Sequence, residues 1–438
     1  RKIMYKQSKT IQNATALLAT AFFVLIPSLL PRTIAGIPEK ESVGFMFLFL
    51  ALYFFMEAFT SEKLKRGVIF GVLSGISTAC MALVWGGVIL LFLSIPLAVL
   101  VAFVLGKVKK QEFYVYVTWF ISMYLVVMPY FKPKFIYQVF ASTRYDVMDM
   151  ISSVSTSIAI LIMVILGISL FLMDLNNKKL ESLEKRSKIP RELFYVILVS
   201  VAFMVLVTLI LGPGFVIRSV SEIYHSLVDP LVSRFGVTVA ENKQPYFTDW
   251  RDSFGPVVLN MPLFFWMFFI GSIAMFSSLV SKINRKNKIL LISGYLIFLT
   301  ALVFSRYSGG GMFNGTNGVS LLFYFGGAIF FVVLCIYCYK RIVNDEELDA
   351  LRNIDFAYVL YLIVFTLGLI IARGGVRFIM VLGAIAPVAI AFLVVKTTEK
   401  FFIEKEDTKK FLFGALAVVF ILASIFTLWN YYKSDEAS

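Results

Sequence analysis

Charged residues are scarce in this chain. They make up 16% of its 438 residues, whereas 59% of the residues are hydrophobic and 16% are aromatic, and the mean hydropathy is +0.86. A chain with so few polar side chains cannot cover the surface of a soluble domain. The composition therefore excludes a soluble globular protein and predicts an integral membrane protein.

Histidine and cysteine are nearly absent. The one histidine, His225, has no ligand partners and is expected to be a surface residue. The three cysteines, Cys80, Cys335 and Cys338, all lie in apolar segments. The last two form a C-x-x-C pattern, but no second pair or histidine lies nearby, so helix packing explains them better than a metal or redox centre. Signal peptides, repeats and low-complexity linkers are not evident either.

The apolar residues gather in segments of roughly 18 to 24 residues, which is long enough to cross the hydrocarbon core as a helix. A membrane barrel would instead alternate apolar and polar residues. We count about thirteen such segments, centred near residues 22, 52, 76, 97, 122, 162, 203, 269, 297, 330, 365, 386 and 421. The sequence thus predicts an all-α, polytopic membrane helix bundle with about 13 transmembrane helices over residues 1–438.

The distribution of Lys and Arg predicts the orientation, because cytoplasmic connections retain these residues during insertion. With a cytoplasmic N-terminus, the cytoplasmic connections carry 28 of the 41 Lys and Arg residues. The external connections carry the other 13, and they are 31–42, 131–150, 213–256, 306–318, 373–377 and 432–438. The net charge of +14 then reflects contact with anionic membrane lipids at the inner surface, and no nucleic acid partner is needed to explain it.

The external connections contain a short acidic motif. Glu39 and Glu41 lie two residues apart in PRTIAGIPEKESVGF, residues 31–45, next to the membrane. Ionisable groups close to the hydrocarbon cost free energy and usually have a function. Hard cations such as Mg²⁺ or Mn²⁺ bind carboxylate oxygens and often share them with substrate phosphates. The sequence leaves two interpretations open, a divalent-cation site and a solvated loop.

Two further external segments add chemistry to the same face. The longest external loop, 213–256, contains Glu241 within GVTVAENKQPYFTDW, and RGGVRF places Arg373 and Arg377 at the outer end of a span. An arginine there can contact a lipid headgroup or clamp a phosphate with two hydrogen bonds. The loop 306–318 also carries the glycosylation acceptor pattern Asn314-Gly315-Thr316.

The sequence resembles the oligosaccharyltransferase catalytic subunits of asparagine-linked glycosylation. It is most similar to the archaeal AglB type, which is related to bacterial PglB and the eukaryotic catalytic subunit. Glu39 and Glu41 fall at the acidic positions of the family's second short motif, TVAE (238–241) matches its T-[IV]-x-E motif, and Arg377 matches an arginine near the lipid pyrophosphate. The tripeptide WGG beginning at Trp85 also recurs at about the right distance.

The resemblance implies a GT-C glycosyltransferase-like fold in the cell membrane with an extracellular active face. The donor would be a polyprenyl-linked oligosaccharide and the acceptor a polypeptide with an N-x-S/T sequon. Glu39, Glu41 and Glu241 would be catalytic and would bind Mn²⁺ or Mg²⁺, and Arg377 would bind the donor. The chain departs from the family pattern by having Glu39 where Asp is usual and by a longer spacing between Glu241 and Arg377.

Parts of the family's machinery are absent from these 438 residues. They contain no WWDYG motif of the C-terminal extracellular domain, and we expect the family's N-terminal helices and first external loop, with its essential Asp, to lie upstream of Arg1. The alternatives are another polyprenyl-dependent GT-C enzyme, such as a protein mannosyltransferase, a non-catalytic paralogue, and a secondary transporter. A transporter would place ionisable residues near the bilayer midplane, whereas here they gather at the outer rim.

Overall fold

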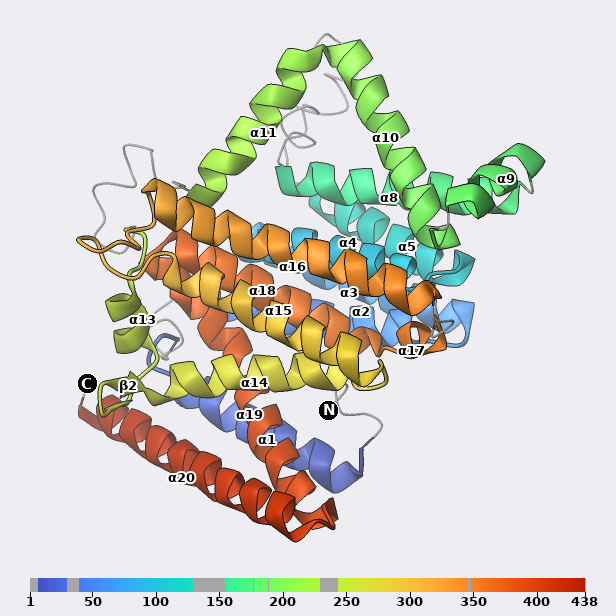
Figure 1. The fold of residues 1–438 in the computed structure, drawn as a ribbon. Coiled ribbons are helices and arrows are strands. Elements are labelled where there is room, and N and C mark those ends of the chain that lie inside the picture. Colours follow the sequence, from blue (N-terminus) through green and yellow to red (C-terminus); the bar gives the residue numbers. More distant parts are fainter. Residues whose placement is uncertain are drawn as a thin grey trace. The chain divides into compact units, whose positions relative to one another are not determined.

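The computed structural model of the chain is mainly helical (Figure 1). Its described residues are 7–29, 39–128, 154–175, 177–187, 189–228, 243–344 and 348–437, and they form 17 α-helices and one two-stranded hairpin. The chain divides into two compact units. Unit 1 comprises Arg1–Ile37, Val220–Ala350 and Phe365–Ser438, and unit 2 comprises Pro38–Ser219 and Leu351–Val364.

Unit 2 is built mainly from long apolar helices. They are α2 (Lys40–Phe59), α3 (Leu64–Val84), α4 (Ile89–Val104), α5 (Lys110–Val127), α8 (Val154–Asp174) and α10 (Arg191–Leu211), with the 3-10 helix η3 (Gly86–Val88) between α3 and α4 and the short polar helix α9 (Lys178–Ser187) before α10. Helix α3 packs against both α2 and α5, and α8 packs against both α4 and α10. Helices α11 (Pro213–Val228), α17 (Leu348–Arg352) and α18 (Phe356–Gly374) each have residues in both units.

Small residues explain the close packing of α3 on α5. Gly71 and Gly75 are four residues apart and therefore share one face of α3. A methyl group at Gly71 would lie 3.3 Å from the carbonyl oxygen of Val115, and one at Gly75 would overlap the carbonyl oxygen of Trp119. The glycines thus let two backbones approach, as is common between helices in membranes. The Trp119 indole then donates a hydrogen bond across the same interface to Thr78 Oγ1 at 3.0 Å.

Helix α19 (Ile379–Ile403) is the centre of unit 1, where it packs against α1 (Lys9–Leu25), α14 (Leu263–Leu279) and α20 (Asp407–Ala437). A methyl group at Gly271 of α14 would overlap the carbonyl of Ala389, so this contact also depends on glycine. Helix α15 (Arg285–Phe304) packs against α16 (Gly318–Asn344). The hairpin β1 (Val257–Val258) and β2 (Met261–Pro262) follows the short helix α13 (Phe247–Ser253) and leads into α14.

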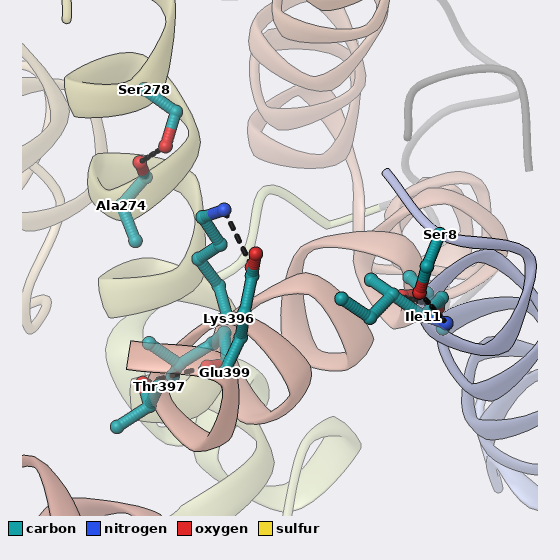
Figure 2. A network of polar contacts seen from close by, with 9 residues as sticks. Ser8, Ile11, Ala274, Ser278, Lys396, Thr397 and Glu399 are labelled. Carbon is teal, nitrogen blue, oxygen red and sulfur yellow. Dashed lines mark hydrogen bonds and ion pairs between the residues drawn. The ribbon is translucent and has the colours of Figure 1, made fainter. Parts of the chain in front are cut away.

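Polar contacts tie the start of α1 to α19. Figure 2 shows the ion pair between Lys396 Nζ and Glu399 Oε2, which are 2.6 Å apart on α19. In the amide orientation that satisfies both of its polar atoms, Gln7 donates to Glu399 Oε1 at 2.9 Å and accepts from Lys396 Nζ at 3.3 Å. Ser8 caps α1 by accepting a hydrogen bond from the Ile11 amide at 3.3 Å. These contacts fix where α1 begins on the surface of α19.

The structure confirms an all-α polytopic membrane fold but supports fewer spans than predicted. All thirteen predicted segments are helical at their centres, yet ten helices among the described residues are long and apolar enough to cross a membrane. The other three are α1 and α14, which have 17 residues each, and α5, which begins with the polar residues Lys110, Gln111 and Glu112. The count of about thirteen treated every apolar run as a full span, whereas these three helices are too short or too polar at one end.

Candidate functional site

The two glutamates of the acidic motif lie at the start of α2. Glu39 is the N-cap residue and is half-buried, and its carbonyl oxygen accepts a hydrogen bond from Ser42 Oγ at 2.9 Å. Glu41 lies in the first turn, and only 1% of it is exposed. Negative charge is stabilised at a helix N-terminus because the backbone N–H groups there are unpaired and the helix dipole is positive. The structure therefore removes the solvated-loop interpretation for Glu41.

Trp85 packs against α2 one turn beyond Glu41. Its side chain is 8% exposed and lies against α2, with its ring centroid 5.1 Å from that of Phe45. A methyl group at Gly44 would lie only 2.8 Å from Trp85 Cε3, and one at Gly87 would overlap the same ring. Trp85 and Gly87 thus pack closely at Gly44 and Phe45 of α2, one turn beyond Glu41.

The arginines of RGGVRF have different environments. Arg373 is in the last turn of α18, and only 3% of it is exposed, whereas Arg377 lies in the 3-10 helix η6 (Val376–Phe378) and is half-buried. The Arg373 guanidinium donates to the Leu227 carbonyl at 3.2 Å and to Ser305 Oγ at 3.3 Å. Arg373 is therefore bound inside unit 1 and is not a headgroup contact, while Arg377 keeps part of its side chain exposed.

A second buried arginine, which the sequence analysis did not single out, lies in unit 1. Arg306 is the first residue of the predicted loop 306–318, and its guanidinium lies over the ring of Tyr246 at 4.6 Å. Gly315, whose φ of +88° suits glycine, packs against the Arg306 side chain. The tertiary fold creates this contact from two distant segments, and the sequence contains no signal for it beyond an arginine at a helix end.

The predicted site residues that the structure describes fall into two separate groups. Glu39 and Glu41 lie together in unit 2, and Arg373 and Arg377 lie together in unit 1. Glu241 and the rest of TVAE lie outside the described residues. Within the described ranges, no three His, Cys, Asp or Glu side chains are grouped so that they could hold a metal ion, and the predicted set of three glutamates stays a prediction.

The predicted loop 213–256 contains regular structure where it is described. Helix α11 begins directly after Gly212 and runs to Val228, and α13 begins at Phe247. The apolar and polar residues of α11 lie on separate faces, so the sequence could have predicted this helix from its period of 3.6 residues.

The fold and these residues define a class, a polytopic membrane protein with a buried carboxylate and a partly exposed arginine at helix ends. A family model described as "Oligosaccharyl transferase STT3, N-terminal" matches residues 3–307. The chain therefore belongs to the oligosaccharyltransferase STT3 family, as the sequence resemblance implied.

A curated relative is also similar to part of the chain. The dolichyl-diphosphooligosaccharide–protein glycosyltransferase subunit STT3 of Saccharomyces cerevisiae is 25% identical over 117 residues, which are 26% of this chain. The aligned region spans 16% of the length of the yeast protein.

Proposed function

We propose that this chain is the membrane part of an oligosaccharyltransferase. It moves a glycan from a polyprenyl phosphate or pyrophosphate donor to the asparagine of an N-x-S/T sequon in an acceptor polypeptide. The observation that carries the proposal is the family match over residues 3–307, which includes both acidic motifs. The name of the yeast relative, a protein glycosyltransferase subunit, supports the same reaction class.

The reaction requires carboxylates near the acceptor amide. An amide nitrogen is a poor nucleophile because its lone pair is delocalised into the carbonyl group, as in a peptide bond. Glu241, with Glu39 and Glu41, accepts the amide N–H groups and thereby favours the attacking form. Arg377 donates hydrogen bonds to the phosphate of the donor and stabilises the charge that develops on the leaving group.

The glutamates also suit a divalent cation. Carboxylate oxygens are the ligands that Mn²⁺ and Mg²⁺ prefer, and Glu41 is a buried carboxylate that a cation would stabilise. We propose that Glu39, Glu41 and Glu241 hold the ion. When bound, the ion would supply Lewis-acid chemistry that stabilises charge on the leaving phosphate oxygens. In this proposal the protein lies in the cell membrane, and the site faces the extracellular side.

The alternative functions are not favoured. A protein mannosyltransferase or a secondary transporter would not be expected to match the STT3 family model over residues 3–307. A non-catalytic paralogue would match it equally well, so the test must measure turnover rather than binding.

The test is transfer of glycan from a lipid-linked oligosaccharide to a sequon peptide by the full-length protein, including any sequence that flanks residues 1–438. A peptide with Gln in place of the sequon Asn is the matched control. We expect transfer to the Asn peptide only, with dependence on Mn²⁺ or Mg²⁺. Absence of transfer at saturating donor, peptide and metal would reject the proposal in favour of a non-catalytic paralogue.

A further inference from the structure

Arg373 is a buried cation that the proposed reaction does not use. Its three contacts inside unit 1 are the Leu227 carbonyl, the Ser305 hydroxyl and the face of the Tyr324 ring, whose centroid lies 4.0 Å from Arg373 Cζ. All three partners are uncharged, and the positive charge of Arg306 acts on the same guanidinium. Burying a charged group away from water costs free energy, and ionisable residues at the ends of membrane spans usually have a functional role.

Two helix ends offset part of this cost. Arg373 lies in the last turn of its own helix, α18, and it donates to a carbonyl in the last turn of α11. The carbonyl groups of both turns have no partners within their helices and carry partial negative charge. A planar guanidinium can donate to Leu227 and Ser305 from two different nitrogens while stacking on Tyr324, which an ammonium group cannot do.

Hydrogen bonds near Arg373 also connect the two ends of one segment. The Gln244 side-chain amide donates to the Val228 carbonyl at 3.0 Å, and the Val376 amide donates to the Lys243 carbonyl at 2.9 Å. Together with the bond from Arg373 to Leu227, these contacts link the end of α11, the segment 243–244 and the turn after α18. We name these three hydrogen bonds the Arg373 clasp. Residues 229–242, which lie between its two ends and include Glu241, are outside the described residues.

We propose that Arg373 is a positioning residue of the transferase. The clasp holds the end of α11 and residues 243–244 against the turn that carries Arg377, one residue beyond Val376. Arg373 acts through these backbone groups and does not touch the donor or the acceptor. The inference rests on the proposed function, since positioning this turn has a purpose only if Arg377 acts on the donor.

The first experiment compares Arg373→Met with Arg285→Met in the full-length protein. Arg285 is an exposed arginine at the start of α15, away from the clasp, and serves as the control. The described partners of Arg373 are uncharged, so Arg373→Met leaves no buried charge unpaired and we expect it to fold. Hydrogen exchange should become faster in peptides covering 221–228 and 243–250 of Arg373→Met and stay unchanged in the control. Unchanged exchange in Arg373→Met would overturn the clasp, whether or not the protein has transferase activity.

The second experiment separates positioning of the donor site from a general loss of activity. In Arg373→Met the kcat/KM for the lipid-linked donor should fall about tenfold to a hundredfold with little change in the acceptor KM, because a displaced Arg377 no longer meets the donor phosphate in the right geometry. Arg373→Lys should not restore donor kcat/KM, since one ammonium group cannot replace the bonds to both Leu227 and Ser305. Gln244→Leu removes a second bond of the clasp without removing a charge, and it should change exchange and donor kcat/KM in the same direction. Faster exchange with normal donor kinetics in both variants, or a selective rise in the acceptor KM, would reject the positioning role.

Discussion

Gly44 offers a sharp test of whether the first turn of α2 belongs to an active site. In Gly44→Ala the new methyl carbon would lie 2.8 Å from Trp85 Cε3 and 3.1 Å from Trp85 Cβ. Carbon atoms pack best at separations of about 3.5 to 4.0 Å, so the helix or the indole ring must move by roughly 0.7 Å or more. Because Trp85 is buried against Phe45, we expect the turn that carries Glu41 to take up part of this movement.

Two effects on stability oppose each other in Gly44→Ala. Alanine favours a helix over glycine by roughly 0.5–1 kcal/mol, whereas an extra methyl group in a packed site costs about 1–3 kcal/mol. The net loss should therefore be about 0–2.5 kcal/mol, which leaves the protein folded. Displacement of catalytic groups by about 1 Å can lower a rate by roughly a hundredfold, so the effect on transfer should exceed the effect on stability.

The assay measures thermal unfolding in detergent and the transfer rate from lipid-linked oligosaccharide to a sequon peptide, side by side. Gly87→Ala introduces an overlap with the same ring, whereas a methyl group at Gly86 would meet nothing within 4 Å. We expect Gly44→Ala and Gly87→Ala to lose about tenfold to a hundredfold in rate and Gly86→Ala to resemble the wild type. Normal transfer by Gly44→Ala and Gly87→Ala would refute the idea that Trp85 supports catalytic glutamates.

Three other predictions concern the remaining site and the orientation. Arg377→Ala should weaken use of the lipid-linked donor about tenfold to a hundredfold, because a charge-assisted contact is lost. Donor and acceptor kinetics measured separately check this. Unchanged donor kinetics would exclude Arg377 from the site. Glu39→Gln and Glu41→Gln should raise the Mn²⁺ or Mg²⁺ concentration needed for half-maximal transfer. Glu241→Gln should also slow transfer at saturating metal. Metal titrations that match the wild type in all three variants would contradict the assignment of these glutamates to a metal site. The Asn314-Gly315-Thr316 sequon should be unmodified, because Asn314 Oδ1 already accepts hydrogen bonds from the Thr316 amide at 3.0 Å and the Asn317 amide at 2.9 Å. Mass spectrometry of the peptide checks this. Labelling of a cysteine at position 314 only from the cytoplasmic side would reverse the predicted orientation.

Much of the fold follows from the sequence because the membrane imposes a simple requirement. Backbone polar groups in hydrocarbon must be paired within the segment, so a long apolar run such as α10 or α20 can only be a helix. The predicted segments that fail as spans, α1, α5 and α14, are limited by length or by a polar end rather than by a wrong secondary structure. Their helical state could be read from the sequence, but their exact ends could not, because caps and neighbouring helices decide where a helix stops.

The candidate site also has features that the sequence predicts and features that depend on tertiary structure. The sequence by itself determined which residue types are available for the chemistry, because Glu39, Glu41, Glu241 and Arg377 lie in short polar stretches between apolar runs and match a family pattern. Only the tertiary structure decided that Glu41 is buried at the start of a helix and that Arg373 faces inward while Arg377 stays partly exposed. The two arginines are four residues apart and look equivalent in the sequence, but α18 ends between them, so the chain changes direction and the two side chains enter different surroundings. Burial and hydrogen bonding depend on segments such as Leu227 and Ser305 that are distant along the chain, and a local pattern contains no information about which distant segment will pack against it.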